Sequence, residues 1–167
     1  QNFYESLDKV LSFKNVKFFQ LRLKNVKKKS LINISKKIKN ITLKHKVKFI
    51  INDNFIVASK IKADGCHMGQ LDGSLGIARK RLKKKLLGAT CHNSKVLAKN
   101  AMNYNVDYVA FGSFFKSRLK PKAKKANLSI LRWAKKEINK PVVVIGGIND
   151  LNYKKLINAG AKYIAIS

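Results

Sequence analysis

Residues 47–68 read VKFIINDNFIVASKIKADGCHM, and they show most clearly which fold the chain adopts. The apolar run at 47–51 predicts a buried strand, residues 55–61 predict a short helix, and residues 65–68 predict a second strand. Helices that alternate with short strands at this spacing are typical of parallel sheets with crossover helices. The stretch therefore predicts one repeat of an α/β fold.

The same alternation continues on both sides of this stretch. It predicts strands at 16–23, 47–51, 65–68, 86–90, 107–111, 141–145 and 163–166, and helices at 3–11, 30–46, 55–61, 75–84, 94–103, 128–138 and 151–158. Ser30 and Asn93 are the expected N-caps of two of these helices.

One more strand in front and one more helix behind would complete eight β/α units. We therefore predict a (β/α)8 TIM barrel, a single domain over residues 1–167 that lacks the first strand and the last helix in this chain. An open doubly wound sheet is the alternative, although no G-x-G-x-x-G motif follows an early strand.

The composition indicates one globular domain with an extreme positive charge. The chain has 167 residues, 46% of them apolar, and its 37 Lys and Arg against 8 Asp and Glu give a net charge of +29. Such a field attracts phosphorylated ligands and nucleic acids. A basic nucleic-acid-binding module is therefore an alternative of another class. Against it, the cations are mostly Lys spread along the whole chain, and the excess of Lys, Asn and Ile suits an A/T-rich coding sequence.

Nothing in the sequence predicts a membrane span or a secretory signal. The longest uncharged apolar run, near 142–148, is far too short to cross a bilayer, and residues 1–10 carry acidic side chains. Cys66 and Cys91 are each followed by His, and adjacent residues of a strand point to opposite faces, so neither pair can easily hold one metal ion. We expect buried, reduced thiols in a cytoplasmic protein with no membrane partner.

Three polar side chains alternate with apolar residues in the first strand and just after it. These are Gln20, Arg22 and Lys24. Because helices cover the outside of a parallel barrel, the apolar residues should face outward and the polar ones inward. Charged side chains inside a barrel need an anion or solvent, and both are available at the C-terminal mouth, where barrel active sites lie.

Two of the few acidic residues directly follow predicted strands. Asp53 follows the strand at 47–51, and Asp72 follows the strand at 65–68, so both should lie at the same rim. Magnesium prefers oxygen ligands, often one or two carboxylates together with substrate phosphates. Capping of the next helix explains Asp residues at such positions equally well, and the spacing leaves both explanations open.

Glycines and the chain end lie where barrels of this type often bind phosphate. Gly146 and Gly147 follow the strand at 141–145, and Ile166 and Ser167 end the chain. Backbone N–H groups in the last two loops of such barrels often hold a phosphate group, and Gly allows a close approach. A simple turn is the other explanation for the two glycines.

Taken in order, these residues resemble the thiamine-phosphate synthases, also called thiamine-phosphate pyrophosphorylases. The resemblance extends from Gln20 to Ser167. It is carried by the segments QLRLK (20–24), ND (52–53), DGCHMGQLD (64–72), GATCH (88–92), DYVAFG (107–112) and IGGI (145–148). The family fold is a (β/α)8 barrel. Its enzymes are Mg²⁺-dependent transferases that join hydroxymethylpyrimidine diphosphate to hydroxyethylthiazole phosphate and release diphosphate.

The resemblance implies a role for each matching residue. Asp53 and Asp72 would hold Mg²⁺, and His67 would line the pocket. Thr90, where the family usually has Ser, would contact the pyrimidine or the diphosphate. The diphosphate would be held by Gln20, Arg22, Lys24, Asn52 and Lys120, of which Arg22, Lys24 and Lys120 would be catalytic. The thiazole phosphate would receive backbone contacts from Gly147, Ile166 and Ser167.

One loop departs from the family pattern Pro-Thr-x-Thr-Lys. It reads KSRLK at 116–120, so Ser117 keeps a hydroxyl for substrate and Leu119 does not, which predicts the loss of one hydrogen bond. A thiazole tautomerase of the same superfamily is a further alternative. Its members do not generally keep the paired acids, so Asp53 and Asp72 favour the synthase.

Overall fold

The structure is a computed structural model that describes residues 2–116 and 125–167. The chain divides into two compact units. The first unit comprises Gln1–Met68 and Ile77–Leu87, and the second comprises Gly69–Gly76 and Gly88–Ser167. The predicted organisation as one domain stays a prediction.

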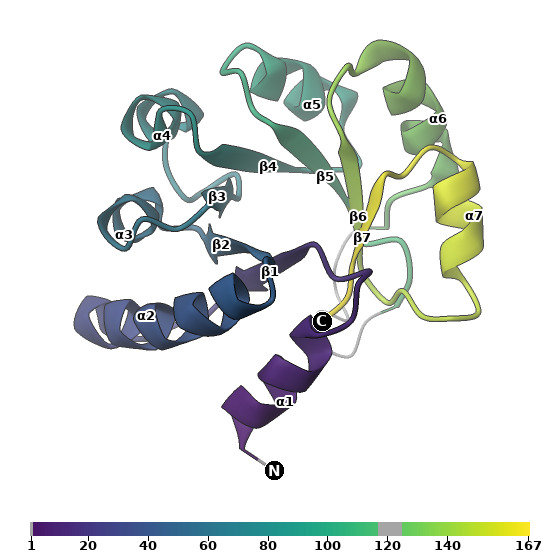
Figure 1. Cartoon of the computed structure of the whole chain (residues 1–167). Helices are drawn as coiled ribbons and strands as arrows, with labels where there is room; N and C mark the ends of the chain where they lie inside the picture. The colour runs from purple at the N-terminus through teal and green to yellow at the C-terminus, as the bar shows by residue number, and fades with distance from the viewer. Residues whose placement is uncertain (1, 117–124) are drawn as a thin grey trace. The chain divides into compact units, whose positions relative to one another are not determined.

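Helices and strands alternate along the described residues, as the sequence predicts (Figure 1). The strands are β1 (Phe18–Leu21), β2 (Lys48–Asn52), β3 (Gly65–Met68), β4 (Leu86–His92), β5 (Tyr108–Gly112), β6 (Val142–Ile145) and β7 (Tyr163–Ala165). The helices are α1 (Phe3–Leu11), α2 (Lys28–Lys44), α3 (Phe55–Lys60), α4 (Leu75–Leu82), α5 (Lys95–Met102), α6 (Leu128–Glu137) and α7 (Tyr153–Asn158).

The strands pair in parallel with their neighbours in the chain. In the first unit β1 pairs with β2 and β2 with β3, so that Leu21 lies beside Ile51 and Ile51 beside Cys66. In the second unit β4 pairs with β5, β5 with β6 and β6 with β7. The strand order across the described residues is β1 to β7, which is the order that consecutive β/α units produce.

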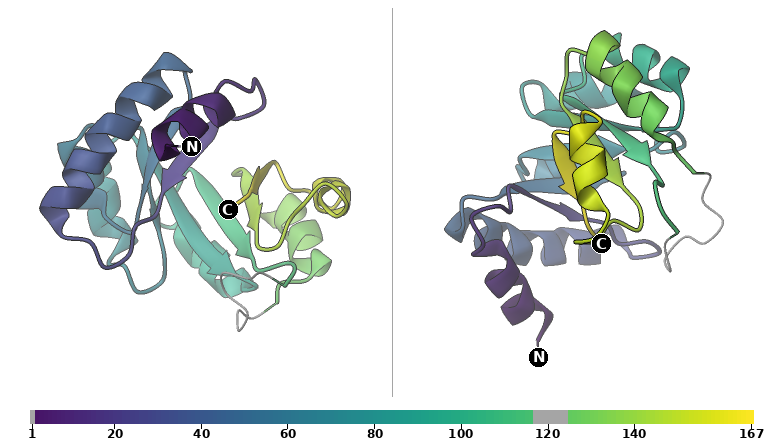
Figure 2. Two further views of the ribbon diagram at one scale, coloured as in Figure 1. Left: turned by 90° about the horizontal axis from the view of Figure 1, so that it is seen from below. Right: turned by 90° about the vertical axis from the view of Figure 1, so that its right-hand side faces the viewer.

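Most residues of β2 and β3 are buried, on both faces of the first unit's sheet. In the first unit Phe49, Ile51 and Cys66 are fully buried, and Phe19 stacks on Phe49 with ring centroids 6.3 Å apart. These residues share the sheet face that α2 and α3 cover (Figure 1). In the second unit α5, α6 and α7 lie outside their strands (Figure 2). The apolar face of each unit is therefore packed against its own helices.

Two helix starts differ from the expected ones. α2 begins before Ser30, and Lys27 occupies the N-cap position without a side-chain hydrogen bond. These residues are exposed, so water can satisfy the first amide groups. α5 is capped by the hydroxyl of Ser94. The expected cap, Asn93, instead accepts a hydrogen bond from the Asn127 amide at 3.3 Å.

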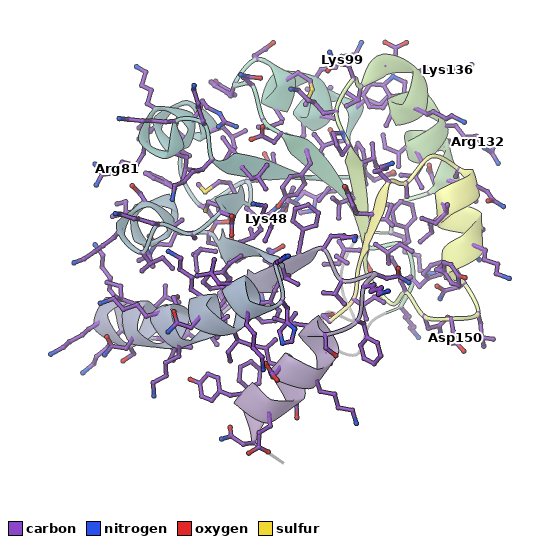
Figure 3. The ribbon with its side chains drawn as sticks, viewed as in Figure 1. Lys48, Arg81, Lys99, Arg132, Lys136 and Asp150 are labelled. Atoms are coloured by element: carbon purple, nitrogen blue, oxygen red, sulfur yellow. The ribbon has the colours of Figure 1, made fainter. Side chains whose placement is uncertain are left out.

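The surface is basic and the thiols are inside. Lys99 of α5 and Lys136 of α6 project outward from the second unit (Figure 3). Cys66 and Cys91 are buried thiols that form no disulfide, and burial raises the pKa of Cys91 to about 12, which confirms the predicted buried thiols. None of the helices within residues 2–116 and 125–167 has the length and apolar character that a membrane span requires.

Candidate active site

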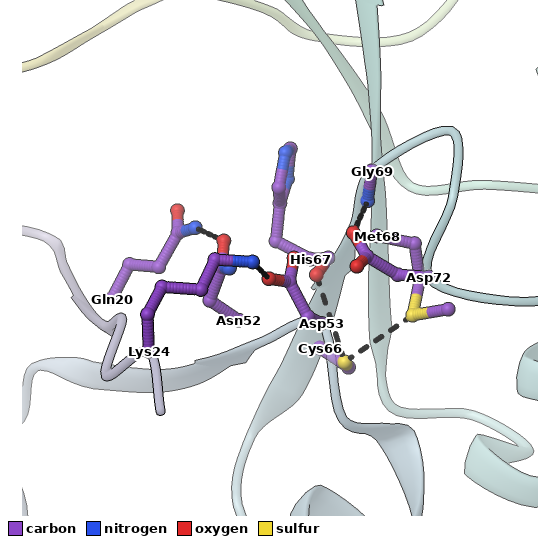
Figure 4. A network of polar contacts seen from close by, with 9 residues as sticks. All are labelled: Gln20, Lys24, Asn52, Asp53, Cys66, His67, Met68, Gly69 and Asp72. Carbon is purple, nitrogen blue, oxygen red and sulfur yellow. Dashed lines mark hydrogen bonds and ion pairs between the residues drawn. The ribbon is translucent and has the colours of Figure 1, made fainter. Parts of the chain in front are cut away.

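The carboxyl ends of β1 and β2 bring two side-chain amides together. Gln20 donates a hydrogen bond from Nε2 to Oδ1 of Asn52 at 2.5 Å (Figure 4). The register sets Gln20 beside Ile50, and residues two apart along a strand share a face. Asn52 in turn lies beside His67 of β3. Three residues that the resemblance assigned to the substrate therefore lie at one end of the first unit's sheet.

Lys24 and Asp53 form an ion pair at the same end. Lys24 Nζ lies 2.5 Å from Asp53 Oδ2 (Figure 4). Asp53 has φ 65°, a left-handed conformation that Asp adopts more readily than most residues. Its N–H donates to the His67 carbonyl at 2.7 Å. The cap of α3 is the next residue, Asn54. Helix capping therefore does not explain Asp53, whose carboxylate is held beside an ammonium group.

His67 is buried behind this pair. Its side chain is 7% exposed, and burial lowers its pKa from 6.5 to about 4, an effect that the negative charge of Asp53 opposes. At neutral pH the imidazole is therefore uncharged. The neutral ring adds no charge beside Asp53, and its role in lining a pocket stays a prediction.

We expect the burial of His67 to make stability depend on pH. The unfolded chain protonates this residue near pH 6.5 and the folded chain only near pH 4, so the unfolded state binds more protons in between. The contribution is complete above pH 6.5 and is lost as pH falls through 4, about 3 kcal/mol in all. Urea unfolding at a series of pH values, with His67→Gln as the comparison, measures this. Equal slopes of free energy against pH for both chains would contradict it.

In the second unit, Asp72 and Thr90 belong to one connected region. Asp72 lies in the loop after β3, and its Oδ2 accepts a hydrogen bond from the Gly69 amide at 2.8 Å (Figure 4). Gln70 of the same loop donates its side-chain amide to the Thr90 carbonyl in β4. Gln70 thus ties the loop to the strand. It lies inside the motif at 64–72, but sequence reasoning gave it no role.

The two glycines after β6 are required by the backbone. Gly146 and Gly147 have φ 107° and 62°, values that Gly adopts at little cost. A methyl group on Gly147 would run into the Lys116 carbonyl and lie 2.8 Å from Phe115 Cβ. Asn152 donates its side-chain amide to the Gly147 carbonyl at 3.0 Å. The turn is therefore tightly held, and no spacing rule pointed to Asn152.

The remaining predicted residues have different positions. Ile166 and Ser167 follow β7, and because Ile145 lies beside Ala165, they leave the sheet at the same edge as Gly147. Arg22 follows β1 and is exposed. The predictions for Ser117, Leu119 and Lys120 lie outside the described residues.

The donor atoms suit a hard cation. Asp53 belongs to the first unit and Asp72 to the second, so their meeting at one ion stays a prediction. The part of the chain that the structure describes contains no group of three or more His, Cys, Asp and Glu that could hold a metal by itself. A few carboxylates completed by water and substrate phosphate are typical of Mg²⁺. The residues present therefore fit the predicted ion in their chemistry.

Comparison with known proteins identifies the family. The family model described as thiamine monophosphate synthase matches residues 1–167. The chain belongs to this family. A thiamine-phosphate synthase of Pelagibacter ubique (strain HTCC1062) is 51% identical over 166 residues, which cover 99% of this chain and 80% of the relative. Another, from Erythrobacter litoralis (strain HTCC2594), is 40% identical over 89% of this chain and 71% of the relative.

A solved structure gives the same answer for the fold. The thiamine phosphate pyrophosphorylase from Pyrococcus furiosus matches with a TM-score of 0.88 and 28% identity, over 99% of this chain and 79% of that one. Together with the parallel strands and alternating helices, this confirms the predicted α/β class, consistent with a TIM-like fold. The resemblance on which the sequence prediction rested is confirmed as well.

Proposed function

We propose that this chain catalyses the synthase reaction of its family, in which hydroxymethylpyrimidine diphosphate and hydroxyethylthiazole phosphate form thiamine phosphate and diphosphate. Thiamine-phosphate synthase, a transferase of thiamine biosynthesis, is the function that the family and the relatives support. The observation in the structure that carries the proposal is the Lys24–Asp53 pair beside Gln20 and Asn52. The fold part of the proposal is a (β/α)8 barrel of which this chain lacks the first strand and the last helix.

The first unit would hold the diphosphate. Lys24 is a cation at the carboxyl end of a parallel sheet, the end at which such folds bind ligands. The amides of Gln20 and Asn52 can each donate to phosphate oxygens. The cations Lys24, Arg22 and Lys120 would neutralise the charge that develops as diphosphate leaves. No protein nucleophile is required, because the chain's part is to position two substrates and stabilise that charge.

Asp53 and Asp72 would hold Mg²⁺. When bound, the ion supplies further positive charge to the departing diphosphate. Lys24 occupies one oxygen of Asp53, which fixes the orientation of the carboxylate. Gly69 does the same for one oxygen of Asp72.

The second unit would hold the other substrate. The turn at Gly146 and Gly147 and the chain after β7 lie at one sheet edge, where backbone N–H groups can bind the thiazole phosphate. Thr90, also of the second unit, would contact the pyrimidine or diphosphate, and His67 of the first unit would line the pocket as a neutral ring.

The test is synthesis of thiamine phosphate from the two substrates, with and without Mg²⁺. The expected result is turnover that requires the metal and stops in excess chelator. Turnover that is unaffected by chelator would contradict the metal role. Tautomerisation of a thiazole substrate without any condensation would favour the alternative enzyme.

We expect Lys24→Met to raise the KM for the diphosphate substrate by about tenfold, since a charge-assisted contact to phosphate contributes roughly 1.5 kcal/mol or more. Stability should fall by less than about 1 kcal/mol, because the ion pair is exposed. Steady-state kinetics and thermal unfolding measure the two effects.

Lys44→Met is the matched control. Lys44 also pairs with an aspartate of the first unit, Asp8, at 2.9 Å, and its side chain is exposed. It joins α2 to α1 and not to the sheet edge. Its loss should leave KM unchanged. An equal rise in KM for both variants would show that general charge, and not the site, is responsible.

A further inference from the structure

The amino-terminal edge of the first unit's sheet carries a second group of cations, away from the carboxyl ends at which Lys24 and Asp53 lie. Its centre is the turn 61–64, between α3 and β3. Three ammonium groups from other elements contact this turn. Lys39 of α2 donates to the Ile61 carbonyl at 3.0 Å, Lys85 before β4 donates to the Ala63 carbonyl at 2.7 Å, and Lys48 of β2 lies 3.2 Å from Asp64 Oδ1.

The turn adds a fourth lysine. Lys62 is exposed and has φ 54°. Four lysines, Lys39, Lys48, Lys62 and Lys85, thus lie at this turn beside one acidic residue, Asp64, and we call their ammonium groups the turn cluster. Arg79 of α4 adjoins it, because its guanidinium donates to the Lys83 and Lys85 carbonyls at 2.7 and 2.8 Å.

Holding the ammonium groups of the turn cluster close together is electrostatically unfavourable. Lys39 and Lys85 are half-buried. Burial and the positive charge of Lys39 lower the pKa of Lys85, with Asp64 opposing and Lys62 adding to the effect. Solvated surface lysines avoid such crowding by turning away from one another. Here backbone carbonyls hold two of the ammonium groups in place, so the positive charge is fixed before any ligand arrives.

We propose that the turn cluster is a second anion site, which binds a compact, multiply charged phosphate such as a triphosphate. Each ammonium group has three donors, and Lys39 and Lys85 direct one each at a carbonyl. An anion with several charges relieves the repulsion among four cations that a single carboxylate only partly offsets. The cluster is small, bounded by four residues of one turn, and therefore suits a compact anion better than a long strand of nucleic acid.

β2 and β3 separate this cluster from the proposed active site. Lys48 begins β2 and Asn52 ends it, so the two ends lie roughly 13 Å apart at 3.3 Å per residue. One phosphate chain bound to the turn cluster does not reach Asp53. The second site is independent of the proposed reaction, and each can be present without the other.

The experiment is a titration of the isotope-labelled full chain with inorganic triphosphate at constant ionic strength, followed by the backbone amide resonances. The amides of residues 61–64 and 85–86 should shift and saturate. Resonances of residues 20–24 and 52–53 report the proposed active site separately in the same spectra. If the amide resonances of residues 61–64 do not shift at high triphosphate concentration, the proposal is wrong, whatever the active-site resonances do.

Three variants separate a local site from the general positive field. Lys62→Gln should raise the dissociation constant for triphosphate about threefold to fivefold, as expected for the loss of one exposed charge. In Asp64→Asn the side chain keeps an oxygen that can accept the hydrogen bond from the Phe49 amide, as Asp64 does. Because the variant removes a negative charge, it should lower the dissociation constant by a similar factor. Lys136→Gln on α6 removes the same charge elsewhere and should change nothing.

Two further outcomes overturn the proposal. The first is an equal loss of affinity in Lys62→Gln and Lys136→Gln, which would show attraction to the whole basic chain. The second is a single-stranded oligonucleotide that binds the same amides more tightly than triphosphate at equal phosphate concentration, which would assign the cluster to nucleic acid.

Discussion

Asp53→Asn is expected to lower kcat/KM for thiamine phosphate formation about a hundredfold or more, a loss of roughly 2.7 kcal/mol in transition-state stabilisation. The substitution removes the negative charge and keeps the shape of the side chain. Asn also adopts left-handed backbone conformations readily, so the φ of 65° at this position remains acceptable. The fold should therefore survive, and the loss should come from the proposed magnesium site.

The dependence on Mg²⁺ makes this prediction specific. With one carboxylate fewer, the concentration of Mg²⁺ that gives half-maximal rate should rise, while the KM for the thiazole phosphate should change little. Assays over a range of Mg²⁺ concentrations measure both quantities. If turnover of Asp53→Asn stays within about threefold of the unsubstituted chain, Asp53 does not hold the metal.

Asn54→Ser is the matched control in the neighbouring position. Asn54 caps α3, since its Oδ1 accepts from the Val57 amide at 2.9 Å, and Ser keeps an oxygen that can do the same. This variant should retain nearly full activity. A large loss of activity here would show that any disturbance of the loop after β2 stops turnover. The effect of Asp53→Asn could then not be assigned to the metal site.

The division of roles between Asp53 and Asn54 also shows what sequence could not decide. Both residues are good N-caps and both follow β2. Capping was one of two open explanations for Asp53, and only backbone geometry separates them. The left-handed turn at Asp53 directs its carboxylate to Lys24, 29 positions earlier in the chain, and leaves Asn54 at the start of α3. Contacts over such separations follow from the fold and not from local pattern.

The segment 47–68 was the easiest to predict, because its apolar runs and its helix all end at strong signals. β2, α3 and β3 agree with prediction to within one residue at each end. The region around Asn93 was harder. Asn93 and Ser94 are both residue types that cap helices. Ser94 is the cap of α5, because the Asn93 side chain accepts a hydrogen bond from the Asn127 amide. The turn cluster could not be predicted from local pattern either, since its four lysines come from four separate segments of the chain.

Gly65→Ala is expected to be the most damaging small change in the first unit. Gly65 begins β3, and a methyl group there would overlap the Leu86 carbonyl and lie 2.6 Å from Leu86 Cβ. Leu86 is the first residue of β4, and its amide donates to the Asp64 carbonyl at 2.9 Å. The clash is with backbone and cannot be relieved by a rotamer change, so the strand must move and this hydrogen bond must lengthen. We expect a loss of about 3 kcal/mol or more in the free energy of unfolding, measured by urea denaturation.

Gly76→Ala provides the comparison. Gly76 lies in α4, and an added methyl would meet the edge of the Tyr104 ring at 3.3 Å and Ser74 Oγ at 3.5 Å, which is ordinary contact. The side chain of Tyr104 can shift, and Ala favours the helix by roughly 0.5–1 kcal/mol. Its free energy of unfolding should therefore stay within about 1 kcal/mol of the unsubstituted chain. Equal stability of Gly65→Ala and Gly76→Ala would mean that the approach of β3 to Leu86 is looser than the structure shows. The tight contact that lets β4 follow β3 in the sheet would then have to be explained by side-chain packing alone.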